Sequence, residues 1–277
     1  MNSYVASGFA LITGAGSGIG KNSAFSFAQA GAAGVMFADI NEKSAQDSAA
    51  ESKKYASNPD YRAVAIHVDV TNETSVQAMV EAAIRGFGRI DYSINSAGIG
   101  TSTMNGIADI PIDEFYHILN VNMKGTMLCT RAVSKAMLLQ EASEFQGRYG
   151  TRSVGRGSIV NLGSLNSCVV VPGKTSYTTA KHAVIGITKT AAVDYAGQGI
   201  RVNAVCPIWV ESPMTEHEAQ VNPHLDHIVK AAVPLKRMAQ PDEVADSIVF
   251  LCSPAASFIT GVSLVIDAGT ALTVRLL

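Results

Sequence analysis

The chain has 277 residues, of which 47% are hydrophobic and 16% charged, and its net charge is −2. This composition is too apolar for a disordered chain and is sufficient to cover both faces of a buried sheet. No basic run offers a surface for nucleic-acid phosphates, and Gly, Thr and Lys interrupt every apolar run before it reaches the length of a membrane span. The first basic residue is Lys21, so the charged start of a secretory signal is missing. We therefore expect a cytoplasmic protein that binds neither nucleic acid nor membrane.

Seven short apolar runs recur along the chain, and each is followed by a residue type common in turns or in sites. They span residues 9–12, 34–38, 63–66, 92–94, 158–162, 201–205 and 263–266. Helix-length stretches lie between them, for example residues 72–87 and 176–195. Continuous apolar strands that alternate with helices are typical of a parallel sheet with helices on both faces. The sequence predicts one Rossmann-type, doubly wound α/β domain over residues 1–277, with a seven-stranded parallel sheet.

Two segments depart from this alternation. Residues 144–157 are polar and rich in Gly and Arg, and we expect a surface loop there. Residues 212–241 form an unusually long connection, which is typical of a functional lid, and we expect it to cover the substrate.

The cysteines and the histidines of the lid do not suggest a metal site. Cys129, Cys168, Cys206 and Cys252 are scattered without a CxxC pair, so we expect inert buried thiols in a reducing compartment. His217, His224 and His227 lie among several prolines and have no defined ligand spacing, so no metal is expected.

A glycine-rich turn follows the first predicted strand and opens a helix. Its sequence is Thr13-Gly14-Ala15-Gly16-Ser17-Gly18-Ile19-Gly20. Glycines allow a tight turn and a close approach of the backbone to a pyrophosphate, which the helix N-terminus then stabilises. The strand before, the helix after and an acid at the end of the second strand make this a strong dinucleotide motif.

That acid, Asp39, is placed to hydrogen-bond an adenosine ribose. It would repel a 2′-phosphate, and its neighbours Ala38, Ile40 and Asn41 carry no positive charge. The sequence therefore favours NAD(H) over NADP(H). The alternative role for Asp39 is a helix N-cap, which Asn41 could fill instead.

Tyr177 and Lys181 are four residues apart, which places them on one face of a helix, one turn apart. A nearby cation favours a phenolate, so the pair makes a plausible general acid/base. Ser164, at the end of the fifth predicted strand, lies at the sheet edge where a nicotinamide is expected.

With these motifs, the chain resembles the short-chain dehydrogenase/reductase family over residues 9–269. The family's glycine motif is complete, and its Asn-Asn-Ala-Gly segment is Asn95-Ser96-Ala97-Gly98 here. The resemblance implies hydride transfer between a nicotinamide and a secondary alcohol or ketone. It implies that Tyr177 moves the hydroxyl proton, Lys181 lowers the pKa of Tyr177 and holds the nicotinamide ribose, and Ser164 polarises the carbonyl. Asn122 would hold a water that relays protons from Lys181.

The resemblance also assigns the cofactor contacts, with Asp69 at the adenine ring and Val210 and Ser212 at the carboxamide. The full set expected at the cofactor is Gly14, Ser17, Gly18, Ile19, Gly20, Asp39, Ile40, Asp69, Val70, Asn95, Ala97, Gly98, Tyr177, Lys181, Pro207, Val210 and Ser212. One departure is Ile208, where the family usually has Gly after Pro207. Either this turn uses an ordinary φ, or the nicotinamide pocket is reshaped.

Residues between Ser164 and Tyr177 should line the substrate cleft, together with residues that follow the sixth strand. We expect the lining to include Asn166, Val171, Gly173, Trp209 and Met214, although Trp209 fits a packing role equally well. This mixed apolar set suggests a fairly hydrophobic substrate, and the overall likeness is to fungal members that tailor secondary metabolites. Two alternatives stay open: a non-redox step such as an isomerisation or cyclisation on the same fold, and a non-catalytic dinucleotide-binding protein.

Two long predicted helices, over residues 113–139 and 176–195, are rich in small and apolar residues. One domain cannot cover so much apolar helix surface, and exposed patches of this kind mark interfaces. By the family resemblance these helices pair across a two-fold axis. We therefore expect a homotetramer, with a dimer as the alternative.

Overall fold

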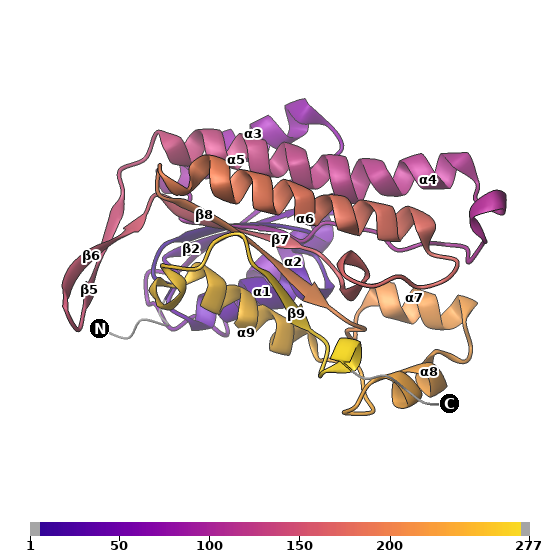
Figure 1. The fold of residues 1–277 in the computed structure, drawn as a ribbon. Coiled ribbons are helices and arrows are strands. Elements are labelled where there is room, and N and C mark those ends of the chain that lie inside the picture. The colour runs from indigo at the N-terminus through magenta and orange to yellow at the C-terminus, as the bar shows by residue number, and fades with distance from the viewer. Residues whose placement is uncertain (1–5, 273–277) are drawn as a thin grey trace.

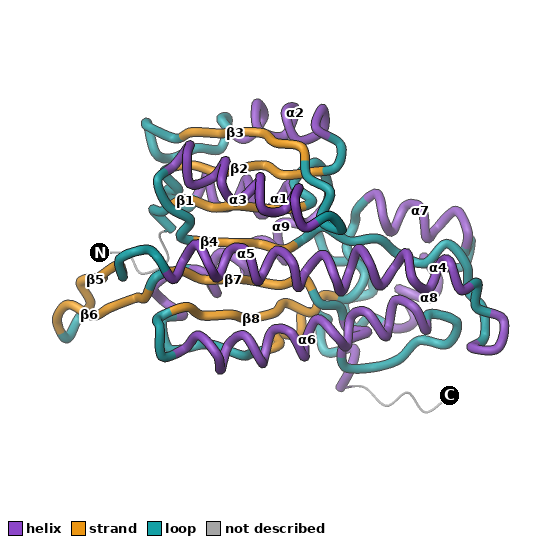
Figure 2. The backbone as a smooth tube through the Cα atoms, turned by 90° about the horizontal axis from the view of Figure 1, so that it is seen from above, coloured by secondary structure: helices purple, strands orange, loops and turns teal. Residues whose placement is uncertain are grey.

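The computed structural model describes residues 6–272, and its centre is one seven-stranded sheet. The strands lie in the order β3-β2-β1-β4-β7-β8-β9, and every neighbouring pair is parallel (Figure 2). Their bounds are β1 Phe9–Thr13, β2 Gly34–Asp39, β3 Arg62–His67, β4 Tyr92–Asn95, β7 Gly157–Leu162, β8 Ile200–Pro207 and β9 Ser263–Ile266. This confirms the predicted seven-stranded, Rossmann-type sheet.

Helices cover both faces of the sheet (Figure 1). One face carries α1 (Gly18–Gln29), α2 (Glu42–Ser52) and α9 (Pro241–Cys252), and the other carries α3 (Glu73–Phe87), α5 (Thr126–Leu138) and α6 (Thr175–Ala196). Side chains alternate between the two resulting cores: Leu11 packs into one and Ile12 into the other. Both cores exclude water, which explains why the strands are apolar at consecutive positions.

The helix predicted over residues 113–139 is interrupted. It begins as α4 (Ile112–Ile118), continues as the π-helical segment η2 (Leu119–Gly125) and ends as α5. π-Helical turns are rare and frequently mark functional positions. Short 3₁₀ turns complete the described elements: η1 Ile107–Asp109, η3 Leu165–Ser167, η4 Pro254–Ala256 and η5 Thr270–Leu272.

The prediction of a surface loop over residues 144–157 is wrong, because this segment forms an antiparallel hairpin. Its strands are β5 (Ser143–Gly147) and β6 (Gly150–Gly155), which are joined by residues 148–149, and Gly150 has φ +109°. The hairpin projects from the end of the molecule opposite α7 (Pro213–Val221) and α8 (Leu225–Ala232) (Figures 1 and 2).

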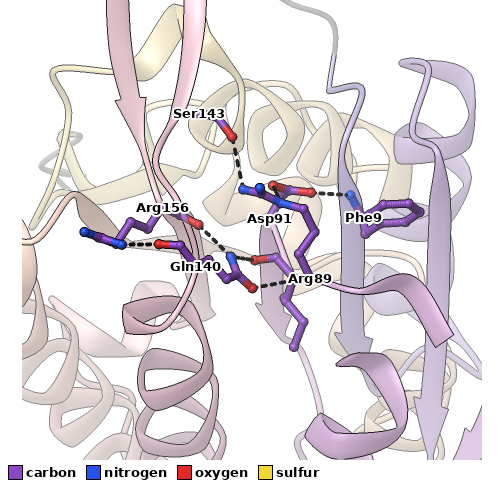
Figure 3. A network of polar contacts seen from close by, with 7 residues as sticks. Phe9, Arg89, Asp91, Gln140, Ser143 and Arg156 are labelled. Atoms are coloured by element: carbon purple, nitrogen blue, oxygen red, sulfur yellow. Dashed lines mark hydrogen bonds and ion pairs between the residues drawn. The ribbon is translucent and has the colours of Figure 1, made fainter. Parts of the chain in front are cut away.

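A polar network ties the base of this hairpin to the sheet (Figure 3). Arg89 donates through Nε to Asp91 Oδ1 at 2.7 Å and through its terminal nitrogen to Ser143 Oγ at 3.0 Å. Gln140 Nε2 donates to the Arg156 carbonyl at 2.9 Å, and Asp91 Oδ2 accepts from Phe9 N at 2.8 Å. The network fixes the entry to β7, the strand that ends two residues before Ser164.

The long connection predicted over residues 212–241 contains the two helices α7 and α8, so it is not a plain loop. Leu225 and Val229 of α8 pack with Trp209, whereas the only buried residue of α7 is Thr215. Among residues 6–272, no helix combines the length and apolar character that crossing a membrane requires.

Candidate active site

The carboxyl ends of the strands meet at one edge, where the glycine-rich turn joins β1 to α1. Gly14 has φ +67°, and a methyl group on it would lie 2.8 Å from Ala97 N, so only glycine fits. Ser17 precedes α1 without forming a side-chain cap, and the first turn of α1 contains no acid. The first backbone N–H groups are therefore free of a competing side-chain acceptor, which fits a pyrophosphate at this helix end.

Asp39 ends β2 and its carboxylate is fixed against this turn. Oδ2 accepts from Gly16 N and Oδ1 accepts from Asn41 N, both at 2.9 Å. The helix cap is Asn41, whose side chain accepts from Ser44 N at 3.1 Å. The structure thus assigns the capping role to Asn41 and leaves Asp39 beside the dinucleotide turn, next to the 69% exposed Ile40.

The other expected cofactor residues follow the ends of β3 and β4. Asp69 accepts from Thr71 N at 2.9 Å, and Val70 is buried against Gly125. The Asn95 side chain points into the protein interior: it is 3% exposed and donates to Asn161 Oδ1 at 2.8 Å. Any contact of Asn95 with a cofactor must therefore come from its backbone.

Ser164, Tyr177 and Lys181 come together where β7 ends and α6 begins. The Ser164 hydroxyl lies near enough to the Tyr177 phenol to lower its pKa. Lys181 Nζ lies 5.5 Å from the Tyr177 ring centroid and donates to the Leu162 carbonyl at 2.7 Å. Lys181 is 6% exposed and Tyr177 is half-buried. The three side chains thus form one cluster at the predicted edge of the sheet.

Burial dominates the protonation of this cluster. It raises the pKa of Tyr177 to about 12. The charge of Glu218 also raises this pKa, and the Ser164 hydroxyl lowers it. Burial also lowers the pKa of Lys181 to about 8. The pKa of Tyr177 is shifted by burial, Ser164, Glu218 and Cys206, so the lowering of this pKa by Lys181 stays a prediction. At neutral pH the site therefore holds a phenol beside an ammonium, which is a proton donor ready for a carbonyl oxygen.

Asn122 lies in η2 and fastens the segment after β4. Its Oδ1 accepts from Ile99 N and its Nδ2 donates to the Ile99 carbonyl, both at 2.8 Å. A methyl group on Gly98 would lie 3.1 Å from Asn122 Oδ1 and 3.8 Å from Lys181 Nζ. Asn122 is therefore next to Lys181, but both side-chain polar atoms are used by Ile99, and the water relay stays a prediction.

The backbone after β8 shows which of the two alternatives holds at Ile208. Among residues 6–272, only Lys236 and Ala268 have a positive φ without being glycine, so Ile208 uses an ordinary φ. Pro207 ends β8, Val210 is buried, and Ser212 caps α7. A methyl group on Gly18 would lie 3.4 Å from Ser212 Cβ, which places the start of α7 against the dinucleotide turn.

The expected substrate-lining residues lie around this edge. Asn166 N donates to Ser164 Oγ at 3.2 Å, and Trp209 packs on α8. A methyl group on Gly173 would lie 3.2 Å from Met104 Cβ, and one on Gly100 would lie 3.5 Å from Met214 Cγ. The carbonyl of Val171 accepts from Lys174 N at 3.2 Å. Segments 98–104 and 164–174 and the start of α7 therefore lie close to one another.

One cysteine departs from the expectation of four buried thiols. Cys129, Cys206 and Cys252 are buried, and burial raises the pKa of each thiol, but Cys168, which follows η3, is exposed. Cys206 lies below the site, where its thiol hydrogen-bonds Ser167. No group of three or more His, Cys, Asp or Glu within the described residues is arranged to hold a metal ion.

Sequence reasoning missed an ion pair beside the site. Lys174 Nζ, immediately before α6, contacts Glu218 Oε1 of α7, and the two side chains are 14% and 20% exposed. The sequence contained no indication of this contact, because the partners are 44 residues apart and each resembles an ordinary surface charge.

Comparison with known proteins places this geometry in a family. The family model described as enoyl-(acyl carrier protein) reductase matches residues 14–271. The short-chain dehydrogenase anuF of Penicillium roqueforti is 46% identical over 268 residues, which cover 97% of each chain.

Solved structures agree. Levodione reductase is 30% identical, with a TM-score of 0.87 over 98% of this chain and 100% of the other. The 3-ketoacyl-(acyl-carrier-protein) reductase of Brucella melitensis, solved with NADH, is 32% identical, with a TM-score of 0.80 over 97% and 100% of the two chains.

Proposed function

Because the chain belongs to the short-chain dehydrogenase/reductase family, we propose that it interconverts a fairly hydrophobic secondary alcohol and its ketone, with NAD(H) preferred over NADP(H). The observation that carries this proposal is the cluster of Ser164, Tyr177 and Lys181 beside the glycine-rich turn. A substrate carbonyl in front of Tyr177 would meet a neutral phenol and a hydroxyl side by side. Likeness to the Penicillium roqueforti dehydrogenase supports a secondary metabolite as the substrate.

The cofactor would lie along the carboxyl edge of the sheet. The turn from Gly14 to Gly20 would hold the pyrophosphate, Asp39 the adenosine ribose, and Asp69 the adenine. The backbone from Asn95 to Gly98 would border the nicotinamide half, with Lys181 at its ribose and Val210 and Ser212 at its carboxamide. When bound, the nicotinamide supplies or accepts the hydride.

The chain's own residues handle the proton. In ketone reduction, the Tyr177 hydroxyl gives its proton to the carbonyl oxygen as the hydride reaches the carbonyl carbon. Ser164 donates a hydrogen bond to the same oxygen and stabilises the charge that develops there. Lys181, charged at neutral pH, stabilises the phenolate that remains, and Asn122 holds the neighbouring loop in place. Oxidation reverses each step.

The substrate class follows from the side chains around the cleft. Met104 and Met214 are 49% and 39% exposed and lie against the segments that face Tyr177. Thioether side chains adapt to varied apolar shapes, which suits a hydrophobic metabolite. Residues 212–241, with α7 and α8, would act as the substrate lid.

We also propose a cytoplasmic homotetramer, with a dimer as the alternative. Met127 of α5 and Val193 of α6 are 39% and 80% exposed, on the helices expected to pair between subunits. Exposed apolar side chains on adjacent helices are typical of an interface.

The test is consumption of NADH with a panel of uncharged aryl and alkyl ketones. Activity that is lost in Tyr177→Phe and Ser164→Ala but kept in Tyr149→Phe would support the proposal; Tyr149 is a fully exposed control at the hairpin tip. NADH binding without oxidation by any ketone would refute it.

A further inference from the structure

The Lys174–Glu218 ion pair joins the lid to the catalytic helix. Lys174 is three residues before Tyr177, and Glu218 lies in α7. Within residues 6–272, no other ion pair has both side chains at 20% exposure or less. Such burial is unusual for Lys and Glu, which rarely leave water unless they are paired.

α7 has little else to hold it in place. Its only buried residue is Thr215, whose hydroxyl donates to the Val210 carbonyl at 2.7 Å, while Met214 and Val221 are exposed. Among the described residues, Lys174–Glu218 is the only ion pair that involves α7. The N-terminal turn of α7 is therefore fixed to the end of β8, and its later part is fixed to the catalytic helix by this pair.

The pair also sets the charge in front of Tyr177. Ser164 lowers the pKa of this phenol and Glu218 and Cys206 raise it, while the Lys181 ammonium lies 5.5 Å from the ring. Lys174 and Glu218 neutralise each other, so the pair adds no net charge beside Tyr177. An anionic substrate gains no attraction from Lys174, and the Lys181 ammonium is 6% exposed and donates to the Leu162 carbonyl.

We propose that the Lys174–Glu218 ion pair determines substrate specificity, by holding α7 against the start of the catalytic helix and by keeping the Lys174 charge neutralised, so that uncharged ketones and alcohols are accepted and carboxylates are rejected. This inference rests on the proposed function. Lys174 and Glu218 are positioning residues in it, since neither needs to touch the reacting atoms.

The experiment compares methyl 4-acetylbenzoate with 4-acetylbenzoate, which differ mainly in one negative charge. The parent should favour the ester in kcat/KM by about tenfold or more. Glu218→Gln frees the Lys174 charge and should shift the ratio toward the carboxylate by about tenfold, whereas Lys174→Met should shift it further toward the ester. The double variant should return to the parent ratio, and Glu216→Gln, on the exposed face of α7, should leave it unchanged.

The pH profile of alcohol oxidation provides a second readout. A carboxylate disfavours the phenolate of Tyr177, so Glu218→Gln should move the alkaline limb to lower pH and Lys174→Met to higher pH, each on the order of one unit. If the pair only held α7 in place, both single variants would lose the same amount of activity. The ester-to-carboxylate ratio of kcat/KM and the pH profile would then be unchanged, and this result would overturn the inference.

Thermal unfolding and NADH binding check that each variant is folded. If a single variant does not fold, the exchanged pair Lys174→Glu/Glu218→Lys keeps both charges, and loss of its ester preference would overturn the inference equally. A parent enzyme that reduces no ketone at all would refute the proposed function instead, so the two failures are distinguishable.

Discussion

Asp39 should determine which dinucleotide the enzyme binds. Its carboxylate is held in place by two hydrogen bonds, because Gly16 N and Asn41 N each donate to one of its oxygens at 2.9 Å. Gly16 belongs to the turn that would hold the pyrophosphate, so a ribose bound next to that turn brings any 2′-phosphate close to a fixed negative charge.

The size of the effect follows from Coulomb's law. Two unit charges about 5 Å apart, at an effective dielectric of about 20, repel by roughly 3 kcal/mol. Asp39 is partly exposed and salt screens such a charge, so about half of this value is a reasonable expectation. Because about 1.4 kcal/mol corresponds to a tenfold change in affinity, NADH should bind at least about tenfold more tightly than NADPH.

Fluorescence titration with NADH and NADPH measures this preference directly. Asp39→Asn removes the charge but keeps an amide oxygen that can accept one of the two backbone hydrogen bonds, so it separates charge from the shape of the turn. This variant should lose most of the discrimination. Asp39→Ala/Ile40→Arg should prefer NADPH, since Ile40 is 69% exposed and its replacement removes no packing. Parent enzyme that binds NADPH as tightly as NADH would show that the reasoning about Asp39 is wrong.

Three further predictions concern catalysis, pH and assembly. Tyr177→Phe should lower kcat by about 10²–10⁴-fold with NADH affinity unchanged; steady-state rates that keep more than a tenth of the parent value would exclude Tyr177 as the acid/base. Since burial raises the pKa of Tyr177 to about 12, its phenolate fraction grows about tenfold per pH unit below that value. Alcohol oxidation should therefore rise with pH and ketone reduction should not, and a flat oxidation profile would contradict this. Val193→Glu should split the tetramer in light scattering, because an unpaired charge would be buried at the expected interface, while Lys53→Glu, beyond the end of α2, should not. A monomeric parent with full activity would exclude the proposed assembly.

The sheet could be predicted from the sequence because its pattern is dictated locally. The inner strands are buried on both faces, so their residues are apolar at consecutive positions, and the seven predicted runs all lie inside observed strands. The glycine-rich turn was equally predictable, since only glycine accepts the backbone of Gly14 and its contact with Ala97.

The hairpin and α7 lacked such patterns. The hairpin has no buried side chain, and its stability depends on distant contacts, such as Arg152, which donates to the Pro254 carbonyl at 3.1 Å and stacks on Phe145. α7 buries only Thr215, so no apolar periodicity distinguishes it from a loop. Both elements form because of partners far away in the sequence.

The same distinction explains why the sequence predicts a reaction more readily than a substrate. Groups that handle the cofactor and the proton belong to short motifs: Tyr177 and Lys181 are one helical turn apart, and Gly16 binds the acid at the end of the very next strand. The groups that surround the substrate come together only in the folded chain. Met104 meets Gly173, Met214 meets Gly100, and Lys174 meets Glu218, with no fixed spacing within any of these pairs. Side chains of this second kind can change without disturbing the motifs, so one catalytic cluster can serve many substrates. In this enzyme, differences in substrate charge should therefore depend on residues such as Lys174 and Glu218 rather than on Ser164, Tyr177 and Lys181.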